Sequence, residues 1–283
     1  MRPSRQVLIT VALAALVVAA FIVGAISQRD PLFSPAHDEL GFVDTGGRTK
    51  IGCATLTGPN TAVLLTLGQS NAGNHGEAPF VPTEAVFNFD PADGVCYTAR
   101  EPLLGATGSG SSPWTRLGDR LIAASLYDKV VIVPIAIDGS SVTDWASGDG
   151  QARLVSAVHG VVSAGLSISH VLWHQGETDA INGMSREVYA RHLTAVLRFV
   201  RGLGVSAPIY IAQASLCMDS PRNDDIREGQ RAVVTRLDGI IAGPDTDTLT
   251  GPDMRYDGCH FTTRGLDAHA ELWFEAMTKA DDR

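Results

Sequence analysis

The chain has 283 residues, which is enough for one large domain or two small ones. Hydrophobic residues make up 45% of it and charged residues 19%, so the composition is that of a globular protein and excludes an intrinsically disordered chain. The formal net charge is -9 and the sequence has no run of Lys and Arg, which argues against a protein that binds the phosphates of a nucleic acid.

Residues 1–30 are predicted to be a signal-anchor or a signal peptide. Arg2 and Arg5 precede residues 7–27, a stretch without charge that is close to the about 20 residues needed to span a membrane. We favour an uncleaved anchor helix, and cleavage after the small residues 25–27 is the alternative. A buried core helix is disfavoured because the stretch has no polar face. With both arginines inside, the rest of the chain lies outside the cytoplasm, either membrane-anchored or secreted.

Residues 31–52 contain Pro, Gly and charged residues without a clear period, which is typical of a linker. The remaining residues, 53–283, are predicted to form one domain. Short apolar runs in it predict strands that are buried on both faces: 63–67, 130–137, 171–173 and 209–214. Helical patterns alternate with them: 114–126, 152–166, 185–202, 224–237 and 265–279. This alternation predicts an α/β fold, a three-layer α/β/α sandwich around a mainly parallel sheet.

In such sheets, ligands bind at the carboxyl ends of the strands, and polar residues follow several of the predicted strands there. Ser70 follows the first run, and Gly139 follows the second. Gln175 and Glu177 follow the third, while the segment with Asp257 and His260 precedes the last helix.

The chain has 4 cysteines, Cys53, Cys96, Cys217 and Cys259, without a Cys-x-x-Cys pair, so a zinc or redox motif is not indicated. Outside the cytoplasm, disulfides are expected, and the sequence leaves all the possible pairings open. We favour Cys53–Cys96 and Cys217–Cys259, because each pair flanks a predicted active-site loop. Four buried free thiols are the alternative.

The blocks that follow the strands resemble those of the SGNH (GDSL-like) hydrolase superfamily. They are most similar to its sialate O-acetylesterase-like branch, which includes carbohydrate esterase family six. The matching blocks are Gly68-Gln69-Ser70-Asn71, Asp138-Gly139-Ser140-Ser141 with the downstream Trp145, Trp173-His174-Gln175-Gly176-Glu177-Thr178-Asp179, and Asp257-Gly258-Cys259-His260. The second block departs from the branch at Asp138, where a glycine is usual.

The resemblance implies a flavodoxin-like SGNH hydrolase fold and assigns catalytic roles. Ser70 is the nucleophile, His260 the general base and Asp257 the group that orients His260. The backbone N–H groups of Ser70 and Gly139 and the side-chain amide of Gln175 form the oxyanion hole. No metal or organic cofactor is implied.

Each of these residues also has a structural interpretation. Ser70 could be a helix N-cap, Asp257 or Gly139 a turn residue, and Gln175 an ordinary polar residue at a strand edge. Glu177 is expected to support the site, either by holding the loop of Gln175 or by facing His260.

Further polar and aromatic residues near these blocks have simpler explanations. Asp179 could cap the next helix, and Asp245 and Asp247 are expected to shape a turn. His170 and His174 could bind zinc if they were helical, but a strand is favoured, so we expect no metal site. Trp145 and Trp173 are expected in the core, with stacking on a sugar as the alternative.

The sequence therefore predicts a serine esterase that removes O-acetyl or other small acyl groups from a carbohydrate through an acyl-serine intermediate. Its expected partners are the O-acylated carbohydrate and, through the N-terminal segment, the membrane; no nucleic acid is expected, and the oligomeric state stays open. The alternatives are a non-catalytic carbohydrate-binding module on the same fold and a lipase- or thioesterase-like SGNH hydrolase.

Overall fold

The structure is a computed structural model that describes residues 47–218 and 220–281. The predicted anchor, residues 1–30, lies outside the described residues, as does most of the predicted linker. None of the helices within the described ranges has the length and hydrophobicity required to span a bilayer. The last part of the predicted linker is not a connection, because β1 (Lys50–Ile51) pairs with β4 (Val95–Thr98) and belongs to the sheet.

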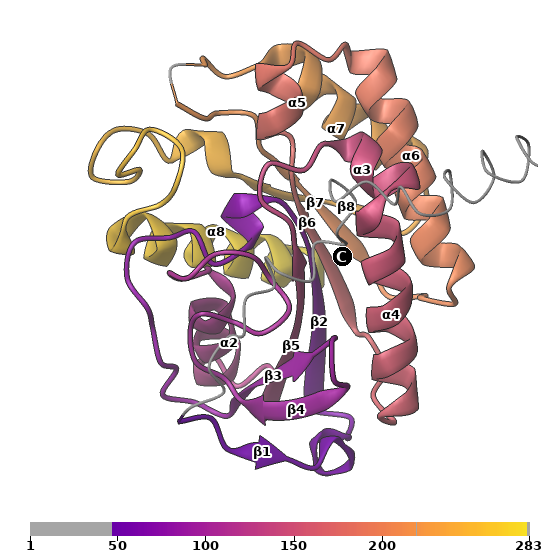
Figure 1. Cartoon of the computed structure of the whole chain (residues 1–283), viewed down its shortest axis with the longest axis vertical. Helices are drawn as coiled ribbons and strands as arrows, with labels where there is room; N and C mark the ends of the chain where they lie inside the picture. The colour runs from indigo at the N-terminus through magenta and orange to yellow at the C-terminus, as the bar shows by residue number, and fades with distance from the viewer. Residues whose placement is uncertain (1–46, 219, 282–283) are drawn as a thin grey trace, which may run out of the picture. The chain divides into compact units, whose positions relative to one another are not determined.

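An eight-stranded sheet forms the centre of the described domain, with the order β1-β4-β3-β5-β2-β6-β7-β8 (Figure 1). The remaining strands are β2 (Thr61–Gly68), β3 (Val86–Asp90), β5 (Lys129–Ala136), β6 (His170–His174), β7 (Ile209–Gln213) and β8 (Ile240–Asp245). Strand β2 pairs in parallel with both β5 and β6, and the pairs β3–β5, β6–β7 and β7–β8 are also parallel. Only β4 runs against its neighbours β3 and β1 among the described strands, so the prediction of a mainly parallel sheet is confirmed.

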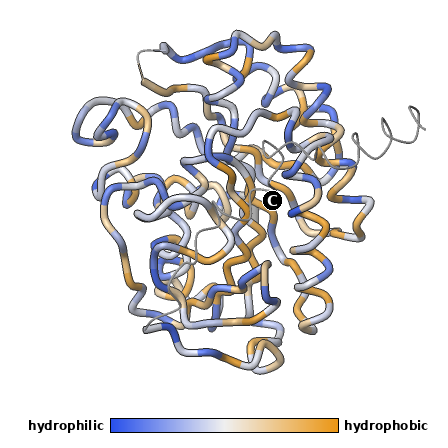
Figure 2. Tube along the Cα trace, in the orientation of Figure 1, coloured by the Kyte–Doolittle hydropathy of each residue, from blue (hydrophilic) through white to orange (hydrophobic). Residues whose placement is uncertain are grey.

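Helices cover both faces of this sheet. The helices are α2 (Trp114–Ala123), α3 (Val142–Ser147), α4 (Asp149–Ser163), α5 (Glu177–Ile181), α6 (Arg186–Gly202), α7 (Asp224–Arg236) and α8 (Thr263–Asp281). Buried residues of α3, α4, α6 and α7 pack with one side of β2, which presents Val63 and Leu65, whereas α2 and α8 pack with the other side, which presents Ala62 and Leu64. Figure 2 shows the resulting hydrophobic centre. The predicted three-layer sandwich is therefore confirmed.

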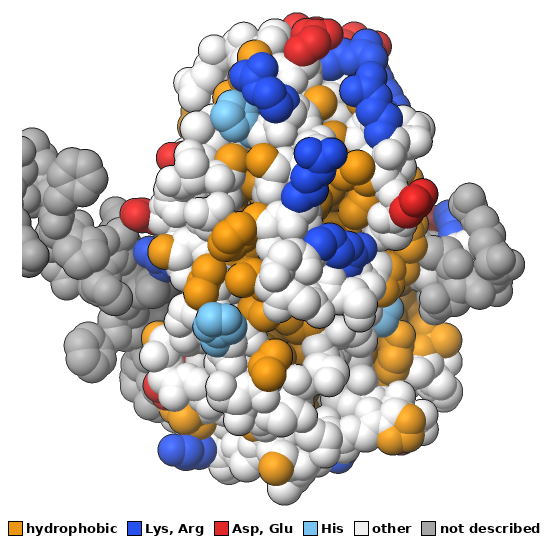
Figure 3. Space-filling view, turned by 90° about the vertical axis from the view of Figure 1, so that its right-hand side faces the viewer, with side chains coloured by type: hydrophobic (Ala, Val, Ile, Leu, Met, Phe, Trp, Pro, Cys, Tyr) orange, Lys and Arg blue, Asp and Glu red, His pale blue; other side chains and the backbone are white. Residues whose placement is uncertain are grey.

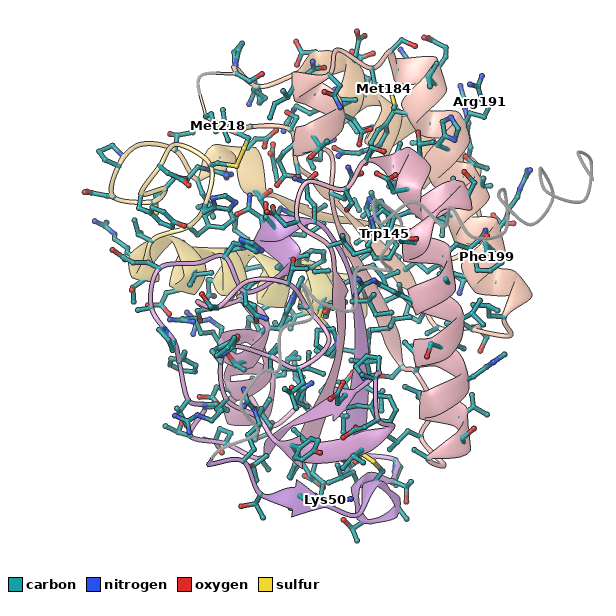
Figure 4. The ribbon with its side chains drawn as sticks, in the orientation of Figure 1. Lys50, Trp145, Met184, Arg191, Phe199 and Met218 are labelled. Carbon is teal, nitrogen blue, oxygen red and sulfur yellow. A yellow bond between two sulfur atoms is a disulfide. The ribbon has the colours of Figure 1, made fainter. Side chains whose placement is uncertain are left out.

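Helix α6 illustrates why the predicted helices form. It buries an apolar stripe that includes Tyr189 and Leu193 against the sheet, at the spacing of a helical turn. Its opposite side carries exposed arginines, among them Arg191 and Arg198, and Figure 3 shows Lys and Arg side chains on this face of the molecule. Figure 4 labels Arg191 on the outer side of the helix. Water therefore meets the charged side of α6 and the core receives the apolar one.

Each predicted helix and strand forms, with ends that differ by a few residues. The sequence did not predict β1, β3, β4, β8, α3 and α5, which are short. Strand β8 also contains Gly243 and Pro244, and it tolerates them because it lies at the edge of the sheet.

Trp145 and Trp173 are fully buried, and their rings meet edge to face with centroids 5.6 Å apart. They belong to the core, as expected, and neither is exposed for stacking on a sugar (Figure 4 labels Trp145 at α3).

Both favoured disulfides are present. Cys53–Cys96 joins the 3₁₀ helix η2 (Cys53–Leu56) to β4, and Cys217–Cys259 joins the segment after β7 to the segment before α8. Buried free thiols are therefore excluded for these residues. Two disulfides in one domain indicate a protein that is located outside the cytoplasm.

Candidate active site

Ser70 follows the central strand β2 at the point where the order of the strands reverses. The chain continues from β2 to strands on one side of it and later to strands on the other, which is where open α/β sheets place ligands. At the end of β2, Gly68 has a φ of +149°, and a Cβ atom there would lie 1.9 Å from the carbonyl oxygen of His174. Only glycine permits this close approach, which delivers the chain to Ser70.

Ser70 itself is the first residue of a short 3₁₀ helix, η3 (Ser70–Ala72), and is 3% exposed. The residue at the N-cap position is Gln69, so the alternative interpretation of Ser70 as a helix N-cap does not apply.

Asp257 and His260 form a hydrogen-bonded pair before α8. The ring nitrogen Nδ1 of His260 lies 2.6 Å from Oδ2 of Asp257, while Oδ1 accepts the backbone N–H groups of Cys259 at 2.8 Å and His260 at 2.6 Å. Burial would raise the pKa of Asp257, but the hydrogen bonds from His260 and Cys259 outweigh it and lower the pKa. Asp257 is thus a turn residue and an ionised partner of His260 at once.

These contacts orient the other ring nitrogen of His260, Nε2. This atom is buried and has no hydrogen-bond partner within residues 47–218 and 220–281. Ser70 and His260 are therefore not hydrogen-bonded to each other in this conformation. Such bonds are often long or absent in free enzymes and form when substrate binds.

Hydrogen bonds hold the segment that follows β2 against the segment that carries His260. The side-chain amide of Asn71 donates to the carbonyl oxygen of Cys259 at 3.3 Å. The backbone N–H of Glu77 donates to the carbonyl oxygen of Phe261 at 3.0 Å. The rings of His75 and His260 stack with centroids 5.5 Å apart. Ser70 and His260, which are far apart in the sequence, therefore lie at the same end of the sheet.

A buried arginine and a disulfide fix the loop of His260 from the other side. Arg255 is 3% exposed and donates to the carbonyl oxygens of Leu249, Thr246 and Cys259. Met218, which Figure 4 labels beside this loop, donates its backbone N–H to Gly258 at 3.0 Å, next to the Cys217–Cys259 disulfide.

Gly139 lies in the turn after β5, beside the end of β2. It has a φ of +64°. The turn of Gly139 lies beside the end of β2 because the backbone N–H of Ile137 donates to the carbonyl oxygen of Gly68 at 3.0 Å. In the part of the chain that the structure describes, the backbone N–H groups of Ser70 and Gly139 have no acceptor.

Gln175 has a different environment from the one that an oxyanion-hole amide needs. Its side chain is fully buried, and Nε2 contacts Oε1 of Gln69 at 3.2 Å, the carbonyl oxygen of Ser140 at 3.1 Å and Oδ2 of Asp179. Protein acceptors therefore occupy this amide, and it is not an exposed polar residue of a strand edge either. Its effect is to hold Ser140, and with it the neighbouring Gly139.

Within the described residues, the side chain of Glu177 forms no hydrogen bond with Gln175 or His260. Its Oε1 accepts the side-chain amide of Asn71 at 2.9 Å, and burial raises its pKa. It supports the residue next to Ser70. Asp179 lies inside α5 and accepts the backbone N–H of Val142 at 3.0 Å. It therefore contacts the first turn of α3, whose N-cap is Ser141, and it is not the cap of the helix that follows it.

The remaining polar residues of the sequence analysis are structural. His170 and His174 lie in β6, as favoured, and burial lowers the pKa of His174 to about 3, so it is neutral. Asp245 and Asp247 do more than shape a turn, because both form ion pairs with Arg227, at 2.6 Å and 2.8 Å.

Three residues near the segment of His260 had no role predicted from the sequence: Asn71, His75 and Asp138. Asn71 stands inside the first block, and His75 follows it within the same loop, so their position after a strand end was the available signal. Burial lowers the pKa of His75, and the nearby Asp138 carboxylate offsets part of this effect.

A family model described as carbohydrate esterase, sialic acid-specific acetylesterase, matches residues 60–279 of the chain. A curated relative, a probable carbohydrate esterase of Arabidopsis thaliana, is 25% identical over 133 residues. This alignment covers 47% of the chain and 49% of the relative, so the chain spans about half the length of the curated relative that it matches.

Solved structures have the same fold. A protein from Arabidopsis thaliana has a TM-score of 0.62 at 21% identity, with 79% of this chain and 98% of that chain covered. A family 3 carbohydrate esterase of Clostridium thermocellum has a TM-score of 0.51 at 12% identity, with coverages of 78% and 96%. A carbohydrate acetylesterase of Xanthomonas citri has a TM-score of 0.52 at 16% identity, with coverages of 76% and 55%.

The match to the family model extends over most of the described domain and includes all the blocks that carry the resemblance. The chain therefore belongs to the sialic acid-specific acetylesterase family of carbohydrate esterases, which are carboxylic ester hydrolases.

Proposed function

We propose that this protein is a serine esterase that removes O-acetyl or other small acyl groups from a carbohydrate through an acyl intermediate on Ser70. The family description supports the acetyl group and the carbohydrate. The position of Ser70 at the end of the central strand supports its role as the nucleophile.

The reaction proceeds in two steps. Ser70 Oγ attacks the carbonyl carbon of the ester while His260 Nε2 takes the hydroxyl proton; the ester C–O bond then breaks, and the sugar hydroxyl leaves with that proton. In the second step, water attacks the carbonyl carbon of the acyl-serine and gives a proton to His260. The bond between the acyl group and Ser70 Oγ then breaks, His260 returns this proton to Oγ, and acetate leaves. Asp257 holds the His260 ring and stabilises its protonated form.

The backbone N–H groups of Ser70 and Gly139 stabilise the oxyanion in both steps. Loss of one such donor typically raises the barrier by about 3–4 kcal/mol. We assign Gln175 a positioning role, because its amide contacts Ser140 and Asp179. This differs from the donor role that the resemblance implies.

One observation carries the proposal: Asp257 orients His260 so that a buried Nε2, without a partner among the described residues, is left beside the segment of Ser70. A carbohydrate-binding module would have no use for such a nitrogen.

The test is acetate release from a panel of O-acetylated glycans that includes O-acetylated sialic acid, xylan and a bacterial surface polysaccharide. Wild-type chain should release acetate from at least one of them, and the Ser70→Ala chain should release none. A serine-reactive phosphonate should label wild type at Ser70. Sugar binding without labelling would favour the binding module, and a preference for long acyl chains on model esters would favour a lipase or thioesterase.

A further inference from the structure

We propose that His75, Asp138 and His260 bind a divalent transition-metal ion such as Zn²⁺, and that the bound ion stops the esterase by occupying His260. The inhibitory part of this inference rests on the proposed function, whereas the binding part does not.

The three side chains come from different segments that meet at the end of the sheet where Ser70 lies. His75 follows η3, Asp138 follows β5 and His260 precedes α8. One potential ligand atom from each lies within 4.8 Å of the others, and within residues 47–218 and 220–281 this is the one group of its kind. Two imidazoles and a carboxylate are donors that Zn²⁺ binds readily.

Hydrogen bonds already orient the two histidine rings, and another fixes the backbone of Asp138. Asp257 contacts Nδ1 of His260, which is the carboxylate–histidine arrangement that typically directs Nε2 at a metal ion. The hydroxyl of Thr107 lies 3.2 Å from Nε2 of His75 and accepts the backbone N–H of Asp138 at 2.9 Å. Thr107 thus links the other two ligands.

The remaining adjustment is small. Donors around a tetrahedral zinc ion lie about 3.4 Å apart, given bonds of about 2.0–2.1 Å. Asp138 is the exposed member of the group, so rotation of its side chain can bring its carboxylate closer to the two histidines. Nε2 of His260, which is buried and without a partner in the described residues, would gain one.

Binding of the ion and catalysis exclude each other. The lone pair of His260 Nε2 that would coordinate the metal is the pair that must accept the proton of Ser70. A chain with the ion bound therefore keeps Ser70 intact but cannot activate it. Removal of the ion restores the lone pair, so the inhibition is reversible.

Binding is tested first in the full chain carrying Ser70→Ala, so that turnover plays no part. Zn²⁺ is added as ZnCl₂ in competition with a chromophoric chelator. We expect one ion per chain, and binding at least about tenfold weaker after the additional change Asp138→Asn or His75→Gln, since even the loss of an outer-shell partner has effects of this size. His159→Gln, an exposed histidine of α4, is the matched control and should bind like the parent.

Inhibition is then measured on a small activated acetyl ester with buffered Zn²⁺, relative to each variant's own rate in excess chelator. Wild type and His159→Gln should be inhibited at the same Zn²⁺ concentration and recover with chelator, whereas Asp138→Asn should need at least about tenfold more. Equal inhibition of all variants, activation by Zn²⁺, or no binding would overturn the inference. An inactive wild type with variant-sensitive binding would support the site and show that the failure lies in the proposed function.

Discussion

Asn71 donates its side-chain amide to Glu177 at 2.9 Å, and the same nitrogen lies 3.3 Å from the carbonyl oxygen of Cys259. Through this one amide, the residue next to Ser70 is joined to the segment after β6 and to the residue next to His260. The position of Ser70 relative to His260 therefore depends on a buried polar contact.

Replacement of Asn71 by Ala should lower both stability and turnover. It leaves the buried carboxylate of Glu177 with one hydrogen bond fewer, which costs about 1–3 kcal/mol, and it releases Cys259 from the segment of Ser70. Urea unfolding and steady-state kinetics measure the two effects, and kcat should fall more than KM rises. The double variant Asn71→Ala/Glu177→Gln should recover part of the stability but not the turnover. Equal kcat in wild type and Asn71→Ala would contradict this interpretation.

Asp257→Asn should reduce kcat on the order of 10³- to 10⁴-fold with little change in KM, because the amide no longer stabilises the protonated His260 ring. Asp253→Asn is the matched control. The carboxylate of Asp253 is exposed and pairs with Arg264 at 3.5 Å on the surface, so kcat should stay within about twofold of wild type. The idea fails if both variants behave alike.

Removal of either disulfide should lower stability equally, but removal of only one of them should lower activity. They close loops of nearly equal length, with sequence separations of 43 for Cys53–Cys96 and 42 for Cys217–Cys259. Loop entropy therefore predicts the same loss, up to about 4 kcal/mol, when either pair is replaced by Ser. Only Cys217→Ser/Cys259→Ser should also lose turnover at a temperature where both variants are folded, because this pair fixes the loop of His260. Thermal unfolding and kinetics test this, and equal activity of the two variants would argue against it.

Ionisation of the buried Glu101 carboxyl should lower the free energy of unfolding as the pH rises. Burial raises the pKa of Glu101 to about 7 from a usual value of 4.5, although Ser112 and Thr115 donate hydrogen bonds to it. The folded protein thus retains a proton that the unfolded chain releases between about pH 4.5 and 7, so the free energy of unfolding should fall across this interval, by up to about 3 kcal/mol.

Glu101→Gln should remove this contribution and be the more stable protein above pH 7, as measured by urea unfolding from pH 4.5 to 8. Glu84→Gln, at an exposed position, should retain the slope of wild type. An unchanged slope in Glu101→Gln would show that another group is responsible.

The sequence predicts those helices and strands whose hydrophobic pattern is regular over many residues. The long β-branched run of β5 and the apolar stripe of α6 need no partner to be recognised. Strand β3 was missed because it is short and places a polar residue, Asn88, in the core, where its amide donates to Leu104 at 3.1 Å. That partner becomes visible only in three dimensions.

The candidate site shows the same division. Ser70 and His260 could be located because each follows or precedes a predictable element, and Asp257 because it lies within reach of His260 along the chain. The direction of the Gln175 amide could not be predicted, since it depends on Ser140 from another strand end. The group of His75, Asp138 and His260 has no linear pattern, because each residue comes from a different segment.

The Cys217–Cys259 disulfide has a consequence for when the protein can act. Ser70 is positioned by the hydrogen bonds of the central sheet, whereas the loop of His260 also depends on a covalent bond that forms under oxidising conditions. A chain in which this disulfide is reduced should keep Ser70 in place but hold the loop of His260 by hydrogen bonds alone. Under the proposed function, the protein would therefore reach its full activity only where this bond can form.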